Sequence, residues 1–237
     1  MSQYDEWVNS TEQQIIKLVQ EKNPVNPARY VLDCMGNYIR DKLNDNIKQC
    51  KACPFNKHKT IIEGDLKRAY ILAISDYPDE EQLDGNECSS PFYHHSCMDG
   101  LQYTMNKYFR TNTIVYSDIV HCYPHQGDTM CIPDKITVNK CYPFVHNLIM
   151  AMQPMYIIIM GNIALSALCE GKTVLKNHGT WTKIYGIDTL ITYNPRSLTE
   201  QNDIAEKWGY DFMAEIKSLA ERIKKEHPET YKMILKE

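Results

Sequence analysis

Nine cysteines give this chain its most obvious capacity for chemistry. Cys50 and Cys53 form a Cys-x-x-Cys pair, a spacing that lets one turn direct both sulfurs at the same metal centre. Cys122 and Cys141 are each followed by Tyr-Pro, and with the first pair they could form a four-cysteine site for zinc or for a [4Fe–4S] cluster. The residues alone leave the third and fourth ligands open, and Cys131, between Cys122 and Cys141, is the main rival.

Other cysteines have different interpretations. Cys34 and Cys169 fall within helical patterns, so we expect them to be thiols of the core. Cys88 and Cys97 flank a Pro-Phe pair and leave open a second, separate metal site.

The bulk composition limits the classes of protein to consider. The chain has no run of about 18 apolar residues, which a transmembrane helix would need, and its first residues lack the pattern of a signal peptide. We therefore expect an intracellular protein, cytoplasmic or nucleoid-associated, with no membrane partner and with metal-binding rather than disulfide-bonded cysteines. A net charge of −4 argues against a wholly basic surface for nonspecific nucleic-acid binding, but allows a local basic patch.

Short apolar runs alternate with helical patterns along most of the chain. The runs are rich in Ile, Val and Tyr and too short for helices, so they predict buried strands of a parallel sheet covered on both faces. We expect an α/β fold with three layers, α/β/α, around a central four-stranded parallel sheet. The predicted strands are 70–74, 113–120, 155–160 and 189–193, and the predicted helices between them are 98–108, 142–152 and 163–169.

Further helices are expected at both ends. Patterns over 3–21 and 28–47 predict a helical N-terminal extension, residues 1–47, packed on a single domain of residues 48–237. An apolar stripe from Ile204 to Ile223 predicts a long amphipathic helix, and we expect the charged residues at the C-terminus to project into solvent.

Polar residues or glycines stand at the end of every predicted strand. The strand ends carry Ser75-Asp76-Tyr77-Pro78, Asp118, Gly161-Asn162 and Asn194-Pro195-Arg196. Because ligands of an open parallel sheet bind beyond the carboxyl ends of its strands, the sequence predicts that these loops meet at one cleft.

The same landmarks resemble, in their order, those of a known family over roughly residues 48–200. A Cys-x-x-Cys pair precedes a basic stretch and a strand, and 75–79 stands where the family has Gly-Glu-x-Pro-Gly. There follow Pro91-Phe92, Cys122-Tyr123-Pro124, Cys141, Gly161, Gly179-Thr180-Trp181 and Asn194-Pro195. The chain thus resembles the iron–sulfur, family 4-like branch of the uracil-DNA glycosylase superfamily.

The resemblance implies a cofactor, a substrate and a partner. It implies a [4Fe–4S] cluster, with zinc as the alternative, on Cys50, Cys53, Cys122 and Cys141. It implies a monomeric DNA glycosylase that binds DNA, flips a nucleotide out of the stack and excises uracil or a modified pyrimidine.

The resemblance also assigns roles in the cleft. Asp76 would orient water or stabilise a cationic sugar, and Asn194 would stabilise the departing base. Phe92 would stack on the base, and Tyr77, Asp118 and Arg196 would complete the substrate site. The alternatives are that Asp76 and Asn194 are turn residues and that Phe92 is an ordinary core aromatic.

Departures from the family fall on this chemistry. Asp76 replaces a Glu, Asp118 replaces the base-reading Asn, and Asn194 replaces a His. Because an ionised Asp can only accept hydrogen bonds, we expect a base with an amino donor to be preferred over uracil. The alternative is that Asp118 is protonated in an apolar pocket and donates as an amide would, so that uracil is excised at acid pH. The same departures are compatible with an enzyme of DNA hypermodification, or with an inactive member that binds DNA or a protein partner.

Overall fold

The computed structural model describes residues 13, 17, 27–79, 88–92, 96–126, 129–199 and 203–236. Its central sheet has the strand order β4-β2-β7-β9-β8, in which the first four strands are parallel and β8 is antiparallel to β9. These strands are β2 (Ile71–Ser75), β4 (Ile114–Asp118), β7 (Tyr156–Met160), β8 (Trp181–Ile184) and β9 (Ile187–Thr192).

The four predicted strands are confirmed, and the sheet has a fifth that was not predicted. β8 joins β9 through Tyr185 and Gly186, both with positive φ, as a two-residue hairpin turn requires. Its residues are mostly half-exposed, so the edge strand lacks the continuous apolar run that marks the others. The sheet is therefore four parallel strands plus one antiparallel edge strand.

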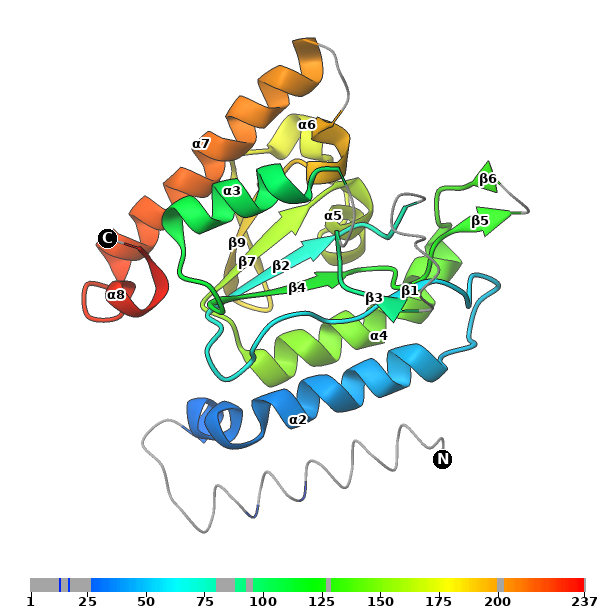
Figure 1. Ribbon diagram of the computed structural model, residues 1–237, viewed down its shortest axis with the longest axis horizontal. Coiled ribbons are helices and arrows are strands. Elements are labelled where there is room, and N and C mark those ends of the chain that lie inside the picture. Colours follow the sequence, from blue (N-terminus) through cyan, green and yellow to red (C-terminus); the bar gives the residue numbers. More distant parts are fainter. Residues whose placement is uncertain are drawn as a thin grey trace.

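Helices cover both faces of the sheet (Figure 1), as the predicted three-layer architecture requires. Alternate residues of β2 divide between two cores: Leu72 and Ile74 pack with α2 and α4, whereas Ile71 and Ala73 pack with α3 and α7. The helical elements are α2 (Pro27–Gln49), α3 (Met98–Tyr108), α4 (Lys135–Met152), α5 (Asn162–Leu168), α6 (Val174–Asn177), η2 (Pro195–Leu198), α7 (Asp203–Glu226) and α8 (Tyr231–Ile234).

The N-terminal region is described mainly through α2. This helix confirms the prediction over 28–47, whereas the predicted helix over 3–21 lies almost wholly outside the described residues. Asn44 ties α2 to the core, because its side chain both donates to and accepts from the backbone of Ile62, at 3.0 and 2.8 Å. The division into 1–47 and 48–237 stays a prediction, and α2 shares one hydrophobic core with α4.

Two helical predictions need correction. α4 starts before Cys141 rather than at it, because the Asp134 side chain accepts a hydrogen bond from the Thr137 backbone N–H, at 2.7 Å, and caps the helix. The charged segment up to residue 236 does not simply project into solvent, since Ile234 and Leu235 are buried and Leu235 pairs with Phe109.

Two short strand pairs flank the sheet. β1 (Lys59–Thr60) pairs with β3 (Cys88–Ser89), and β5 (His125–Gln126) pairs with β6 (Thr129–Met130). Among the described residues, none of the helices has the length and apolar character needed to cross a membrane.

Candidate functional site

The carboxyl ends of β2, β7 and β9 open onto a pocket of about 590 Å³. Three of the predicted loops meet here, and a long helix, α7, adds a wall. The polar and aromatic residues that line the pocket include Asp76, Tyr77, Asp79, Asn194, Arg196 and Trp208.

Asp76 is fixed at the floor of this pocket by its fit against Gly161. Its Oδ1 accepts a hydrogen bond from the Ala164 backbone N–H at the start of α5, at 2.8 Å. Gly161 has φ of 116°, and a Cβ there would lie 2.1 Å from Asp76 Oδ2. Only glycine therefore allows the carboxylate to sit where it does.

The electrostatics of Asp76 suit a group that exchanges protons near neutrality. Burial raises the pKa of this carboxyl from 3.8 to about 6, while hydrogen bonds from Ala164 and Asn194 and the charge of Arg196 oppose the rise. Burial is also the main cause of the raised pKa of Tyr77, with the negative charge of Asp76 second.

Asn194 lies beside Asp76, although the two are 118 residues apart in the sequence. Its Nδ2 donates to Asp76 Oδ2 at 3.2 Å, and its Oδ1 accepts from the Arg196 backbone N–H at 3.1 Å. The backbone donor at Oδ1 fixes which end of the amide points into the pocket. Asn194 therefore presents N–H donors there.

Arg196 lies between the pocket and two other predicted site residues. Its guanidinium carbon stands 4.3 Å from the centroid of the Phe92 ring. Its Nη2 lies 3.4 Å from Asp118 Oδ1, and its Nε lies 3.8 Å from Asp79 Oδ2. The side chain is only 8% exposed.

Asp118 and Phe92 lie behind this guanidinium and are not among the described residues that line the pocket. Both are buried, at 0% and 1% exposure. The carboxylate of Asp118 also accepts hydrogen bonds from the hydroxyls of Ser75 and Thr60. The two residues predicted to contact a base thus reach the pocket only through Arg196.

An aromatic wall completes the pocket and was not predicted. Trp208 stacks on Tyr193 with centroids 5.1 Å apart, and Tyr193 lies 4.5 Å from the His178 ring. His178 Nδ1 is 2.7 Å from Oε1 of the buried Glu215. Trp208 belongs to the apolar stripe that predicts the helix α7, and nothing in that pattern distinguishes it from the residues that pack on the core.

The four predicted cysteine ligands come together away from this pocket. Cys53, Cys122 and Cys141 are buried and Cys50 is partly buried. The pKa of the Cys122 thiol is raised first by burial and then by the charges of the other three cysteines. Burial likewise raises the pKa of Cys141 to about 11.

The donor set fits an iron–sulfur cluster in kind and number. A [4Fe–4S] cluster takes four cysteine thiolates, and these four thiols interact across the end of α2, the loop after β4 and α4. Within the described part of the chain, no group of three or more His, Cys, Asp or Glu side chains is arranged to hold a single metal ion. The Lys59 ammonium lies nearby and donates to the backbone oxygens of Lys48 and Cys50, at 2.6 and 2.8 Å.

Other cysteines have different surroundings. Cys131 lies close enough to Tyr77 at the cleft to raise its pKa slightly. Cys34 is exposed, so its prediction as a core thiol is wrong, because it lies on the outer face of α2. Cys169 is partly buried and packs against the core.

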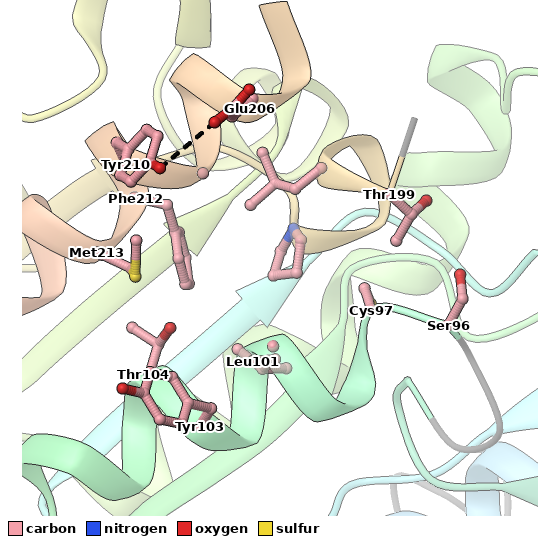
Figure 2. Close-up of a pocket in the computed structure, with 14 residues that line it drawn as sticks. Ser96, Cys97, Leu101, Tyr103, Thr104, Thr199, Glu206, Tyr210, Phe212 and Met213 are labelled. Atoms are coloured by element: carbon pink, nitrogen blue, oxygen red, sulfur yellow. Dashed lines mark hydrogen bonds between the residues drawn. The ribbon is translucent and has the colours of Figure 1, made fainter. Parts of the chain in front are cut away.

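A second pocket, of about 560 Å³, lies between α3 and α7 (Figure 2). Leu101 and Phe212 line it, and the exposed Tyr210 donates to Glu206 Oε1 at 3.3 Å. The short helix η2 separates the two pockets, because Pro195 and Leu198 face this one whereas Arg196 faces the first.

Comparisons with known proteins bear on the same part of the chain. The sequence model of the family described as Uracil DNA glycosylase superfamily matches residues 62–215. A protein of Pyrobaculum aerophilum named Type-4 uracil-DNA glycosylase is 24% identical over 169 residues, which cover 66% of this chain and 83% of that protein. The family match includes all the described residues of the first pocket, as well as Cys122 and Cys141, and begins after Cys53.

Proposed function

Because this chain belongs to the uracil DNA glycosylase superfamily, we propose that it flips a nucleotide out of DNA and hydrolyses the N-glycosyl bond of uracil or a modified pyrimidine. One observation carries the proposal. Asp76 and Asn194 come from opposite ends of the family match, and a 3.2 Å hydrogen bond joins them at the floor of a pocket large enough for a base.

Asp76 supplies the negative charge that the reaction requires. With a pKa of about 6, its carboxyl group is ionised at neutral pH and can orient water or stabilise an oxocarbenium-like sugar. The hydrogen bonds from Ala164 and Asn194 hold the carboxylate in one orientation.

Asn194 supplies the donor for the leaving base. One N–H of its Nδ2 is directed at Asp76, and the amide nitrogen carries a second N–H that can donate to a base oxygen as negative charge develops. The Arg196 backbone N–H holds the amide in place, so little reorganisation is needed.

We also propose that Cys50, Cys53, Cys122 and Cys141 hold a [4Fe–4S] cluster, with zinc as the less favoured alternative. Four buried or partly buried thiols support this assignment, since Cys122 lies close enough to the other three for their charges to raise its pKa. When bound, the cluster would supply a rigid cross-link between α2, α4 and the loop after β4. The proposed partner is DNA, bound by a monomer inside the cell.

A noncatalytic DNA-binding or partner-binding member is the second candidate function. One observation favours it. The guanidinium of Arg196 lies over Phe92 and against Asp118, so it separates the two residues predicted to contact a base from the pocket.

Oligonucleotides that each carry one test base, in single and double strands, distinguish the two candidates. We expect abasic sites with at least one pyrimidine, and we expect Asp76→Asn to abolish them. Asp188→Asn, which removes a carboxylate at the amino end of β9 and away from the pocket, should keep them. Absence of abasic sites with every base, from a protein that still binds DNA, would favour the noncatalytic candidate.

The cluster has its own test in the composition of the purified protein. Prepared without oxygen, it should be brown and hold about four irons per chain. Cys50→Ser and Cys141→Ser should lose iron, whereas Cys34→Ser, at an exposed thiol, should keep it. Stoichiometric zinc without iron would overturn the cluster and keep the ligands.

A further inference from the structure

The guanidinium of Arg196 occupies a slot with the properties of a base-binding site. Phe92 forms one face of the slot, 4.3 Å from the guanidinium carbon, and Asp118 forms one edge, 3.4 Å from Nη2. Both residues are fully buried. A flat group with N–H donors therefore lies where an aromatic face and a desolvated carboxylate meet.

These two contacts are those that a protein makes with a flipped base. The base needs an aromatic surface for its face and hydrogen-bond partners for its edge. The guanidinium lies over the Phe92 ring and directs N–H groups at Asp118, the two contacts that an aminopyrimidine would make with its ring and exocyclic amine.

The surroundings of Asp118 determine which bases can replace the guanidinium. Ser75 and Thr60 already donate to its oxygens, so Asp118 offers the slot acceptors only. A carbonyl at the edge of uracil would bring lone pairs against this carboxylate. An exocyclic amine, by contrast, would restore the donor that Arg196 supplies.

Resting on the proposed function, we propose that Arg196 is a built-in occupant of the base slot. The Arg196 side chain fills the slot in the free protein and leaves it when a base enters. The vacated slot then selects a base that carries an amino donor at its edge.

The geometry gives Arg196 a route out of the slot. Asn194 Oδ1 holds its backbone N–H, so only the side chain has to move. Asp79 lines the adjacent pocket of about 590 Å³ and already lies 3.8 Å from Arg196 Nε. The guanidinium can therefore turn into the pocket and keep one carboxylate partner.

The competing interpretation is a permanent ion pair that joins η2 to β4 and never opens. The two interpretations differ in what Arg196→Ala does to the binding of free bases. An opened slot should bind free cytosine at least about tenfold more tightly than the wild type does, and more tightly than free uracil. Guanidinium ion should compete with cytosine for that variant.

Arg222→Ala is the matched control. Arg222 also lies over an aromatic ring, that of Trp181 at 4.1 Å, and pairs with Asp188 at 3.2 Å, but at the other end of the sheet. Calorimetric titration with cytosine and uracil should show no gain for this variant. No gain for Arg196→Ala, or an equal or larger gain for uracil, would overturn the proposal.

A measurement on the wild type covers the case in which Arg196→Ala does not fold. With nitrogen-15 labelling, binding of a cytosine-bearing single strand should shift the Nε–H resonance of Arg196 and leave that of Arg222 in place. An unchanged Arg196 resonance in the bound protein would overturn the proposal. Neither readout depends on base excision, so a failed glycosylase assay and a failed slot are distinguishable.

Discussion

At the amino end of the sheet, Arg222 lies over the ring of Trp181 and pairs with Asp188 and Glu226, at 3.2 and 2.9 Å. At the carboxyl end, Arg196 lies over Phe92 and pairs with Asp118 and Asp79. The parts are of the same kinds: one guanidinium, a close aromatic ring and two carboxylates, although Arg222 also lies 6.0 Å from the centroid of the Tyr156 ring.

Burial separates the two arrangements. The side chain of Arg222 is 27% exposed and those of its carboxylates are 29% and 40% exposed, whereas Arg196 is 8% and Asp118 is 0% exposed. Water screens the first set, so each pair contributes on the order of 1 kcal/mol or less. In the second set each charge depends on its partner, because an uncompensated buried charge is costly. A ligand that replaced Arg196 as the partner of Asp118 would therefore change the energy of the carboxyl end far more than a ligand at the amino end could.

The largest difference between the two ends is expected in catalysis. Asp76→Asn should lower the rate of base excision by about 100- to 10,000-fold, because the positioned carboxylate is lost. Asp188→Asn should leave the rate within about twofold. Single-turnover assays on the best substrate of the panel provide the measurement, and equal rates for both variants would remove Asp76 from the mechanism.

The pH dependence of Asp76 follows from its raised pKa. Excision should rise as pH increases through about 6, where the carboxyl ionises. Stability changes in the opposite sense: the folded protein holds this proton more tightly than the unfolded chain, so stability falls as pH rises from about 4 to 6. The unfolding free energies of the wild type and of Asp76→Asn, measured across this pH range, should differ by an amount that falls as the pH rises. A flat difference would contradict the raised pKa.

The next largest effect is expected on stability. Asp118→Ala should lower the free energy of unfolding by about 3–5 kcal/mol, because Arg196 then lacks its buried partner. Asp188→Ala should cost on the order of 1 kcal/mol or less. Urea denaturation of the two variants compares the ends directly. Similar losses would mean that burial does not distinguish the two arrangements.

The smallest effect is expected from salt. In about 1 M NaCl the loss of stability in Asp188→Ala should shrink towards zero, because exposed pairs are screened. The loss in Asp118→Ala should change little, because ions do not reach a fully buried carboxylate. A strong salt dependence at both ends would show that water enters the carboxyl end.

Much of the architecture could be predicted because it depends on local patterns. β2 and β7 are nearly continuous apolar runs buried on both faces, and the superfamily expected from the ordered landmarks is confirmed by the family match. β8 escaped prediction because an exposed edge strand needs no apolar run. Ile234 and Leu235 escaped because the short apolar run Met233–Leu235 within a charged segment forms no recognisable period.

The site was predictable in place but not in its contacts. Topology places Asp76 and Asn194 at the carboxyl ends of β2 and β9, on either side of β7, so their meeting at one edge of the sheet could be anticipated. The contact of Arg196 with Asp118 joins residues 78 apart and depends on side-chain direction, which no periodicity encodes. The roles of both pairs remain predictions.

Gly161 and Asp76 also set the order in which mutations can accumulate in this chain. A Cβ at 161 would lie 2.1 Å from Asp76 Oδ2, so any larger residue is excluded while that carboxylate remains. A lineage could gain a side chain at 161 only after Asp76 had become smaller, and it would by then have lost the proposed catalytic group. Substitution at position 161 is therefore possible only after substitution at position 76. In a library randomised at both positions and selected for folding, side chains at 161 should appear only beside glycine or alanine at 76, and rarely even there, because φ of 116° strains any other residue.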